Sequence, residues 1–204
     1  MGTQASSVPR YRLSFLVGGL LAGEAAIAAP LYLSLDDWKS TRAALDASNL
    51  LHARTQASAV RTSRELVQRM ATLTDAEVTY LATASSSDRR HLMWVAFCRR
   101  YVLVAEFAVE VLRERFLLGT LVLETADFER FVSSKSLWHE ELEVLKPSTL
   151  RKLRTNLYLA LRQAGLLTEQ GCIIPALLSR QVRAFLDDQR PSDIRFFPTS
   201  GDTR

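Results

Sequence analysis

The stretch that most constrains the fold is RRHLMWVAFCRRYVLVAEFAVEVLRERFLLG, at residues 89–119. As a helix it is apolar on most sides, which predicts a central helix buried in the core. Asp88 can cap its start, and Gly119 ends it. Charged residues inside the run argue against a helix that spans a bilayer. They are Arg99, Arg100, Glu106 and Glu110.

Other patterns predict helices before and after this one. They cover residues 14–29, 37–48, 55–71, 74–84, 125–135, 148–164 and 175–188, with a short helix near Trp138. The sequence TDAE at 74–77 is a capping box that opens one of them. CIIP at 172–175 is the best candidate for a strand. We therefore expect a mainly α, compact helical protein with at most a small β element.

The N-terminal sequence RYRLSFLVGGLLAGEAAIAAPLYL resembles a secretory signal and could also be taken for a membrane span. Its uncharged run, Leu13–Gly23, is shorter than the ~20 residues that a bilayer needs. Glu24 ends the run, and Pro30 breaks the helical pattern. We interpret residues 14–29 as a buried helix whose small residues allow close packing.

Two stretches of the chain carry its excess positive charge, within a formal net charge of +4 over 204 residues. One lies at residues 146–167 and the other at 50–70, and an acidic stretch at 120–145 separates them. Each basic stretch is either a solvated helix face or a contact for a polyanion.

The basic stretch at 148–167 has an apolar stripe that predicts one buried face. Four cations lie on or beside the other faces: Arg151, Lys152, Arg154 and Arg162. They are densest in the first turn, where free backbone amides also favour phosphate. Arg154 borders the stripe and could instead pair with an acid such as Glu143.

The stretch that begins near Arg54 divides into a small, alanine-rich face and a polar face. We expect the polar face to carry Arg54, Ser58, Arg61, Thr62, Glu65, Gln68 and Arg69. Arginine mixed with short hydroxyl side chains suits contact with phosphates and base edges. A membrane-surface helix would instead show large apolar anchors.

Both basic helices follow a shorter helix and a turn. After the second one comes GLLTEQGCIIP, in which Gly171 allows a tight turn. Helix, turn, basic helix and small β element is the order of a winged helix-turn-helix. The expected regions are a tail at 1–12, a helical region with a helix-turn-helix-like element at 13–85, the core helix at 86–119, a winged-helix-like region at 120–188, and a polar tail at 189–204.

Several segments taken in order resemble the BrxA family of BREX bacteriophage-defence systems. They include YRLSFLVGGLLAGEA, NLLHARTQASAVR, CRRYVLVAEFAVEVLRERF and WHEELEVLKPSTLRKLR, and the resemblance covers about residues 11–198. It implies a helical, DNA-binding protein with helix-turn-helix elements. It does not imply which residues contact DNA.

Catalytic motifs find little support in this sequence. WHEELE lacks the second histidine of a zinc protease, and VGGLLAGE lacks the lysine and the preceding strand of a phosphate-binding loop. We expect no enzyme activity, no metal and no cofactor. Cys98 is expected to be a buried free thiol.

The sequence thus predicts a cytoplasmic, non-enzymatic accessory protein of phage defence that binds double-stranded DNA and no membrane or small-molecule substrate. The expected contacts are Arg54, Ser58, Arg61, Thr62, Arg69, Arg151, Lys152, Arg154 and Arg162. Two alternatives stay open. One is an adaptor that mainly contacts other BREX proteins, and the other is an RNA-binding helical protein.

Overall fold

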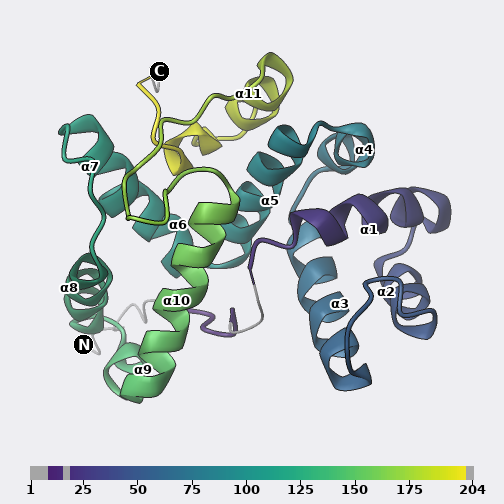
Figure 1. The fold of residues 1–204 in the computed structure, drawn as a ribbon, viewed down its shortest axis with the longest axis horizontal. Coiled ribbons are helices and arrows are strands. Elements are labelled where there is room, and N and C mark those ends of the chain that lie inside the picture. Colours follow the sequence, from purple (N-terminus) through teal and green to yellow (C-terminus); the bar gives the residue numbers. More distant parts are fainter. Residues whose placement is uncertain (1–8, 16–18, 201–204) are drawn as a thin grey trace, which may run out of the picture.

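The computed structural model describes residues 9–15 and 19–200, and the fold is mainly α-helical, as predicted. Figure 1 shows α10 near the middle, with α1, α2 and α3 to one side and α7, α8 and α9 to the other. The elements are α1 (Ala22–Leu35), α2 (Trp38–Ala47), α3 (Gln56–Met70), α4 (Asp75–Thr83), α5 (Ser86–Arg100), α6 (Val102–Phe107), the π-helix η1 (Ala108–Arg113), α7 (Glu114–Leu117), α8 (Thr125–Ser136), α9 (Glu140–Glu143), α10 (Pro147–Gln163), α11 (Arg180–Asp187) and the 3-10 helix η2 (Asp193–Phe196).

The long apolar run forms the centre of the core, as expected, but it is not one helix. Residues 91–98 of α5 are all buried. The chain then becomes extended at Tyr101 and continues as α6, η1 and α7. At this break the buried Tyr101 hydroxyl donates to Glu65 of α3 at 2.7 Å. No sequence pattern predicts this contact.

Local capping chemistry confirms several expected helix starts and corrects two. Asp37 caps α2, Thr55 caps α3, and the capping box of Thr74 and Glu77 opens α4. The core helix is capped by Ser85 and not by Asp88, which lies one turn inside it. The sequence also suggests Thr125 as the N-cap of α8, but the N-cap is Glu124, whose N–H donates to the Asp127 carboxylate at 2.7 Å.

The first helix was expected at residues 14–29, and this boundary is wrong. Ser14 and Phe15 precede any helix, residues 16–18 lie outside the described part, and α1 begins at Ala22. It also continues past Pro30 to Leu35, and its small buried residues lie on the side that faces the core. Those residues are Ala25, Ala28 and Ala29, which fits the close packing that the sequence predicted.

The expected strand near Cys172 is reduced to two antiparallel bridges. Val122 pairs with Cys172, and Leu167 pairs with Ile173. The segment around Cys172 therefore lies between the one that precedes α8 and the one that follows α10. Gly171 has a φ of 86°, which permits the turn between the two paired segments after α10.

The C-terminal segment was expected to be a polar tail from Gln189, but it packs into the core. Ile194, Phe196 and Phe197 are buried, and the carbonyl of Phe196 accepts from Trp94 Nε1 at 3.0 Å. The last helix is correspondingly shorter than expected and begins at Arg180.

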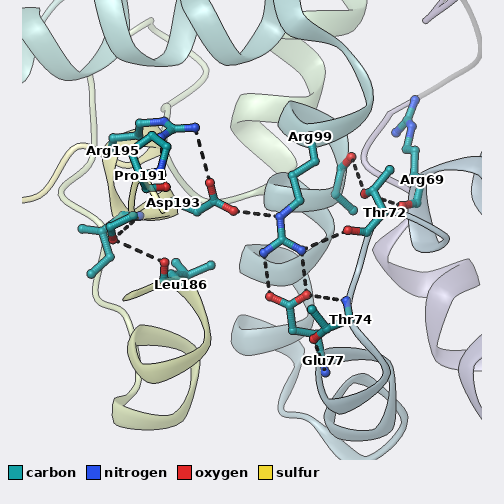
Figure 2. Close-up of polar contacts among 12 residues, drawn as sticks. Arg69, Thr72, Thr74, Glu77, Arg99, Leu186, Pro191, Asp193 and Arg195 are labelled. Carbon is teal, nitrogen blue, oxygen red and sulfur yellow. Dashed lines mark hydrogen bonds and ion pairs between the residues drawn. The ribbon is translucent and has the colours of Figure 1, made fainter. Parts of the chain in front are cut away.

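Arg99 on α5 fastens this segment to the rest of the fold. Figure 2 shows its guanidinium between Asp193 of η2 and Glu77 of α4. Nε lies 2.7 Å from Asp193, and Nη1 lies 2.6 Å from Glu77. An arginine that bridges two buried carboxylates and binds one of them with two N–H groups fixes geometry as well as charge.

Candidate nucleic-acid interface

The helix α3 presents a different face to the core from the one that its sequence suggested. Its buried residues are Ala59, Ser63, Glu65, Leu66, Val67, Arg69 and Met70. Ala57 belongs to the alanine-rich face that the sequence pattern predicted to be buried, but it is exposed. The buried face instead contains a pair of opposite charges, Glu65 and Arg69.

Arg69 was expected to contact DNA, and the structure corrects this. Its side chain is 0% exposed. Nε donates to Glu65 at 2.7 Å, Nη1 donates to the Gly19 carbonyl at 2.7 Å, and the guanidinium lies over the ring of Phe97. Burial lowers the pKa of Arg69, and Glu65 acts in the opposite direction. Arg69 is a core residue.

Three other predicted residues of α3 do share one surface. Ser58, Arg61 and Thr62 line a groove of about 1040 Å³. Arg54, one turn earlier, is exposed but does not belong to the groove lining.

In α10 the expected apolar stripe is buried. It includes Leu153, Leu157, Ala160 and Leu161, and Pro147 opens the helix as its first residue. Arg151 and Lys152 are both exposed, and neither forms an ion pair with any residue that the structure describes.

The two other predicted cations of α10 are held by carboxylates. Arg154 pairs with Glu129 of α8, and not with Glu143. Arg162 Nε lies 3.3 Å from Glu169 in the turn that follows α10. Glu129 and Glu169 are mostly exposed, so a polyanion could compete for both arginines.

The two basic stretches, far apart in the sequence, meet at this groove. Lys152 of α10 lines it together with Arg61 of α3. In Figure 1 these helices stand on either side of the segment that leads into α1. Helical periodicity describes each stretch separately, so it could not predict that the two share one surface.

A third groove cation, Arg90 near the start of α5, was not predicted from the sequence. It belongs to the run that was expected to form the core. Arg90 lies directly before His91, where the continuous buried part of α5 begins. Glu24 is the one carboxylate in the groove lining among the described residues, which leaves the groove with an excess of positive charge.

The histidine of WHEELE, His139, makes stacking and polar contacts within the fold. His139 stacks on Tyr11 with ring centroids 3.8 Å apart, and its Nδ1 lies 3.2 Å from Glu141. Glu141 also accepts from the Tyr11 N–H at 2.6 Å. Within the described residues no group of three metal-ligating side chains comes together.

None of the helices in the described part combines the length and the apolar character that a membrane crossing requires. The apolar N-terminal run instead supplies core residues such as Phe15 and Leu20, together with the first turn of α1.

Comparison with known proteins places the chain in a family. The family model described as BrxA matches residues 9–190. The chain belongs to the BrxA family. A curated relative, "BREX protein BrxA" of Escherichia coli O9:H4 (strain HS), is 28% identical over 151 residues, which is 74% of this chain and 71% of the relative. The resemblance seen in the sequence is thereby confirmed.

The fold is shared with a crystal structure of an uncharacterized protein from Magnetospirillum magneticum. The TM-score is 0.75 at 21% identity, and the match covers 92% of this chain and 97% of the other. At 21% identity this similarity supports a shared fold and nothing about function.

Proposed function

We propose that this BrxA-family protein binds double-stranded DNA as a non-enzymatic, cytoplasmic accessory component of a BREX phage-defence system. One observation carries the proposal. Arg61 and Lys152, from two helices far apart in the sequence, converge on one groove without an ion pair among the described residues. Exposed cations that gather on one side without carboxylate partners suit a polyanion.

The order of elements after the core supports a winged helix-turn-helix interpretation of residues 120–188. The segment at Val122, helix α8, the short helix α9, helix α10 and the paired segments at Leu167 and Ile173 follow one another in that order. In such a motif the second helix enters the major groove with its N-terminal residues towards the bases. Arg151 and Lys152 occupy that position on α10.

The relative named as a BREX protein supports a place in the same kind of system. The other components would then be protein partners. An adaptor role is the second candidate, because three large apolar side chains beside α9 are strongly exposed. They are Leu137 at 77%, Trp138 at 75% and Val144 at 78%. Exposed apolar side chains that cluster in one place mark protein contacts more often than they mark DNA contacts.

The proposal is tested by fluorescence anisotropy of a labelled DNA duplex, titrated with the full chain at about 50 mM salt. Unlabelled duplex of scrambled sequence and RNA duplex of the same sequence serve as competitors. We expect the scrambled DNA to compete almost as well as the original sequence, and the RNA to compete poorly. Equal competition by RNA would favour the RNA-binding alternative, and the absence of any binding would favour the adaptor.

A further inference from the structure

The loop that leads into α1 is held from two sides at one end of the groove. The Gly19 carbonyl accepts from Arg69 of α3 at 2.7 Å, and the Leu20 N–H donates to Gln163 Oε1 of α10 at 2.6 Å. Gly19 also has a φ of 56°, which side-chain-bearing residues rarely adopt, and a Cβ there would meet Gln163 Oε1 at 2.4 Å, so the glutamine would have to move. The position of α1's first turn relative to α3 and α10 is therefore fixed.

The first turn of α1 faces the groove without a side-chain cap. Its N-cap, Leu21, is in the left-handed conformation and offers no hydrogen bond from its side chain. Ala22, Gly23 and Glu24 line the groove, and the first N–H groups of a helix have no partner within it. A Cβ built on Gly23 would meet nothing within 4 Å, so a side chain at this position of the groove would enter open space.

Three cations from three different helices line the same groove: Arg61 of α3, Arg90 of α5 and Lys152 of α10. All three are exposed, and none is paired with a carboxylate among the described residues. Elsewhere in the fold, Arg99, Arg115 and Arg154 each pair with a carboxylate. Like charges gathered around one cavity repel each other, and an anion placed between them relieves that repulsion.

We propose that this groove is a binding site for a phosphate group, with Arg61, Arg90 and Lys152 as its cationic ligands. Backbone amides at the start of α1 supply further donors, and Glu24 limits the affinity. The phosphate belongs either to the DNA backbone, in which case the inference rests on the proposed function, or to a free nucleotide. The chemistry of the site is the same for both sources, and Arg90 is a binding residue in both.

Gly23 offers a test that separates charge from bulk. Gly23→Asp places a carboxylate in the open space, and Gly23→Ala places only a methyl group there. Both changes suit a helix, and an acid in the first turn also stabilises it. Neither variant should therefore melt below the wild type, and only Gly23→Asp should lose phosphate binding.

The measurement is a ¹H–¹⁵N correlation titration of the full chain with inorganic phosphate at constant ionic strength. We expect saturable shifts of the amide signals of residues 23 and 24 in the wild type and in Gly23→Ala. Affinity should fall at least about tenfold in Gly23→Asp and in Arg90→Ala, since each change opposes or removes a charge-assisted bond. Arg64→Ala removes an exposed cation of α3 outside the groove and should leave the shifts unchanged.

Two further ligands distinguish the sources. If 5′-AMP binds at least about tenfold more tightly than phosphate, the site serves a free nucleotide. If 5′-AMP binds like phosphate and duplex DNA displaces both, the site serves the DNA backbone. Linear shifts without saturation in the wild type, or unchanged binding in Gly23→Asp, would overturn the inference.

Failure of the inference can be told apart from failure of the proposed function. Duplex binding that survives Gly23→Asp and Arg90→Ala would leave DNA binding standing without this phosphate site. Saturable phosphate binding in a protein that binds no duplex would leave the site standing and remove the proposed function.

Discussion

Arg69 Nε lies 2.7 Å from Glu65 Oε1, and both side chains are buried at the junction of α3 with the core. The Tyr101 hydroxyl donates to the same carboxylate at the point where the core helix is interrupted. The pair therefore sets the rotation of α3, and it decides which residues of that helix face the groove.

Replacing Arg69 by alanine should destabilise the protein strongly. Glu65 would be left as an uncompensated buried charge, which costs about 3–5 kcal/mol of unfolding free energy. Urea denaturation measures the loss of unfolding free energy. The matched control is Arg64→Ala on the same helix, which is exposed and should cost less than about 0.5 kcal/mol. A loss below about 1 kcal/mol for Arg69→Ala would show that the pair does not fix α3.

Substitutions in the apolar stripe of α10 should lower stability, whereas substitutions on its basic face should not. Leu157 is 1% exposed, so Leu157→Ala should cost about 2–5 kcal/mol in a denaturant melt. The double variant Arg151→Ala, Lys152→Ala removes exposed side chains and should melt close to the wild type. An equal loss of stability in both variants would mean that the cations are structural.

The C-terminal segment should matter for stability even though its sequence looks like a tail. Phe197 is fully buried, and Phe197→Ala should cost about 3–5 kcal/mol. Ser200, in the same segment, is exposed, and Ser200→Ala is the control. A Phe197→Ala protein that unfolds at the wild-type urea midpoint would contradict the burial of this segment in the core.

The two cysteines should differ sharply in reactivity. Cys98 is buried, and burial raises the pKa of its thiol well above the usual value, whereas Cys172 is exposed. A thiol reagent at neutral pH should modify one thiol quickly in the native protein and the second only after denaturant is added, because the thiolate is the reacting form. Mass spectrometry of the quenched reaction identifies the site, and rapid labelling at Cys98 would be inconsistent with the core.

Residue patterns were sufficient to predict the helices that depend on local sequence signals. The capping box at Thr74, the apolar stripe of α10 and the apolar run around Trp94 each depend on neighbours within a few residues. Local patterns did not predict the break at Tyr101, whose hydroxyl contacts Glu65 on another helix.

The same limit applies to the candidate site. Helical spacing placed Ser58, Arg61 and Thr62 on the polar face of α3 and Lys152 off the apolar stripe of α10, and all four line the groove. Spacing also placed Arg69 on a polar face, since a buried ion pair has the same sequence signature as two exposed charges. Arg90 was missed because its neighbourhood is created by α1 and α10, which the chain brings together only on folding.

The most direct test of the central claim is the salt dependence of duplex affinity, measured for the wild type and for the double variant Arg61→Ala, Lys152→Ala. If about four to six phosphates are neutralised, log K should fall with log salt at a slope of roughly −4 to −5. The double variant should reduce the magnitude of that slope by about two, because two phosphates would no longer be neutralised, and its melting temperature should be unchanged. A wild-type slope near zero, or the same slope in both proteins, would contradict the account of this groove as a DNA-binding surface.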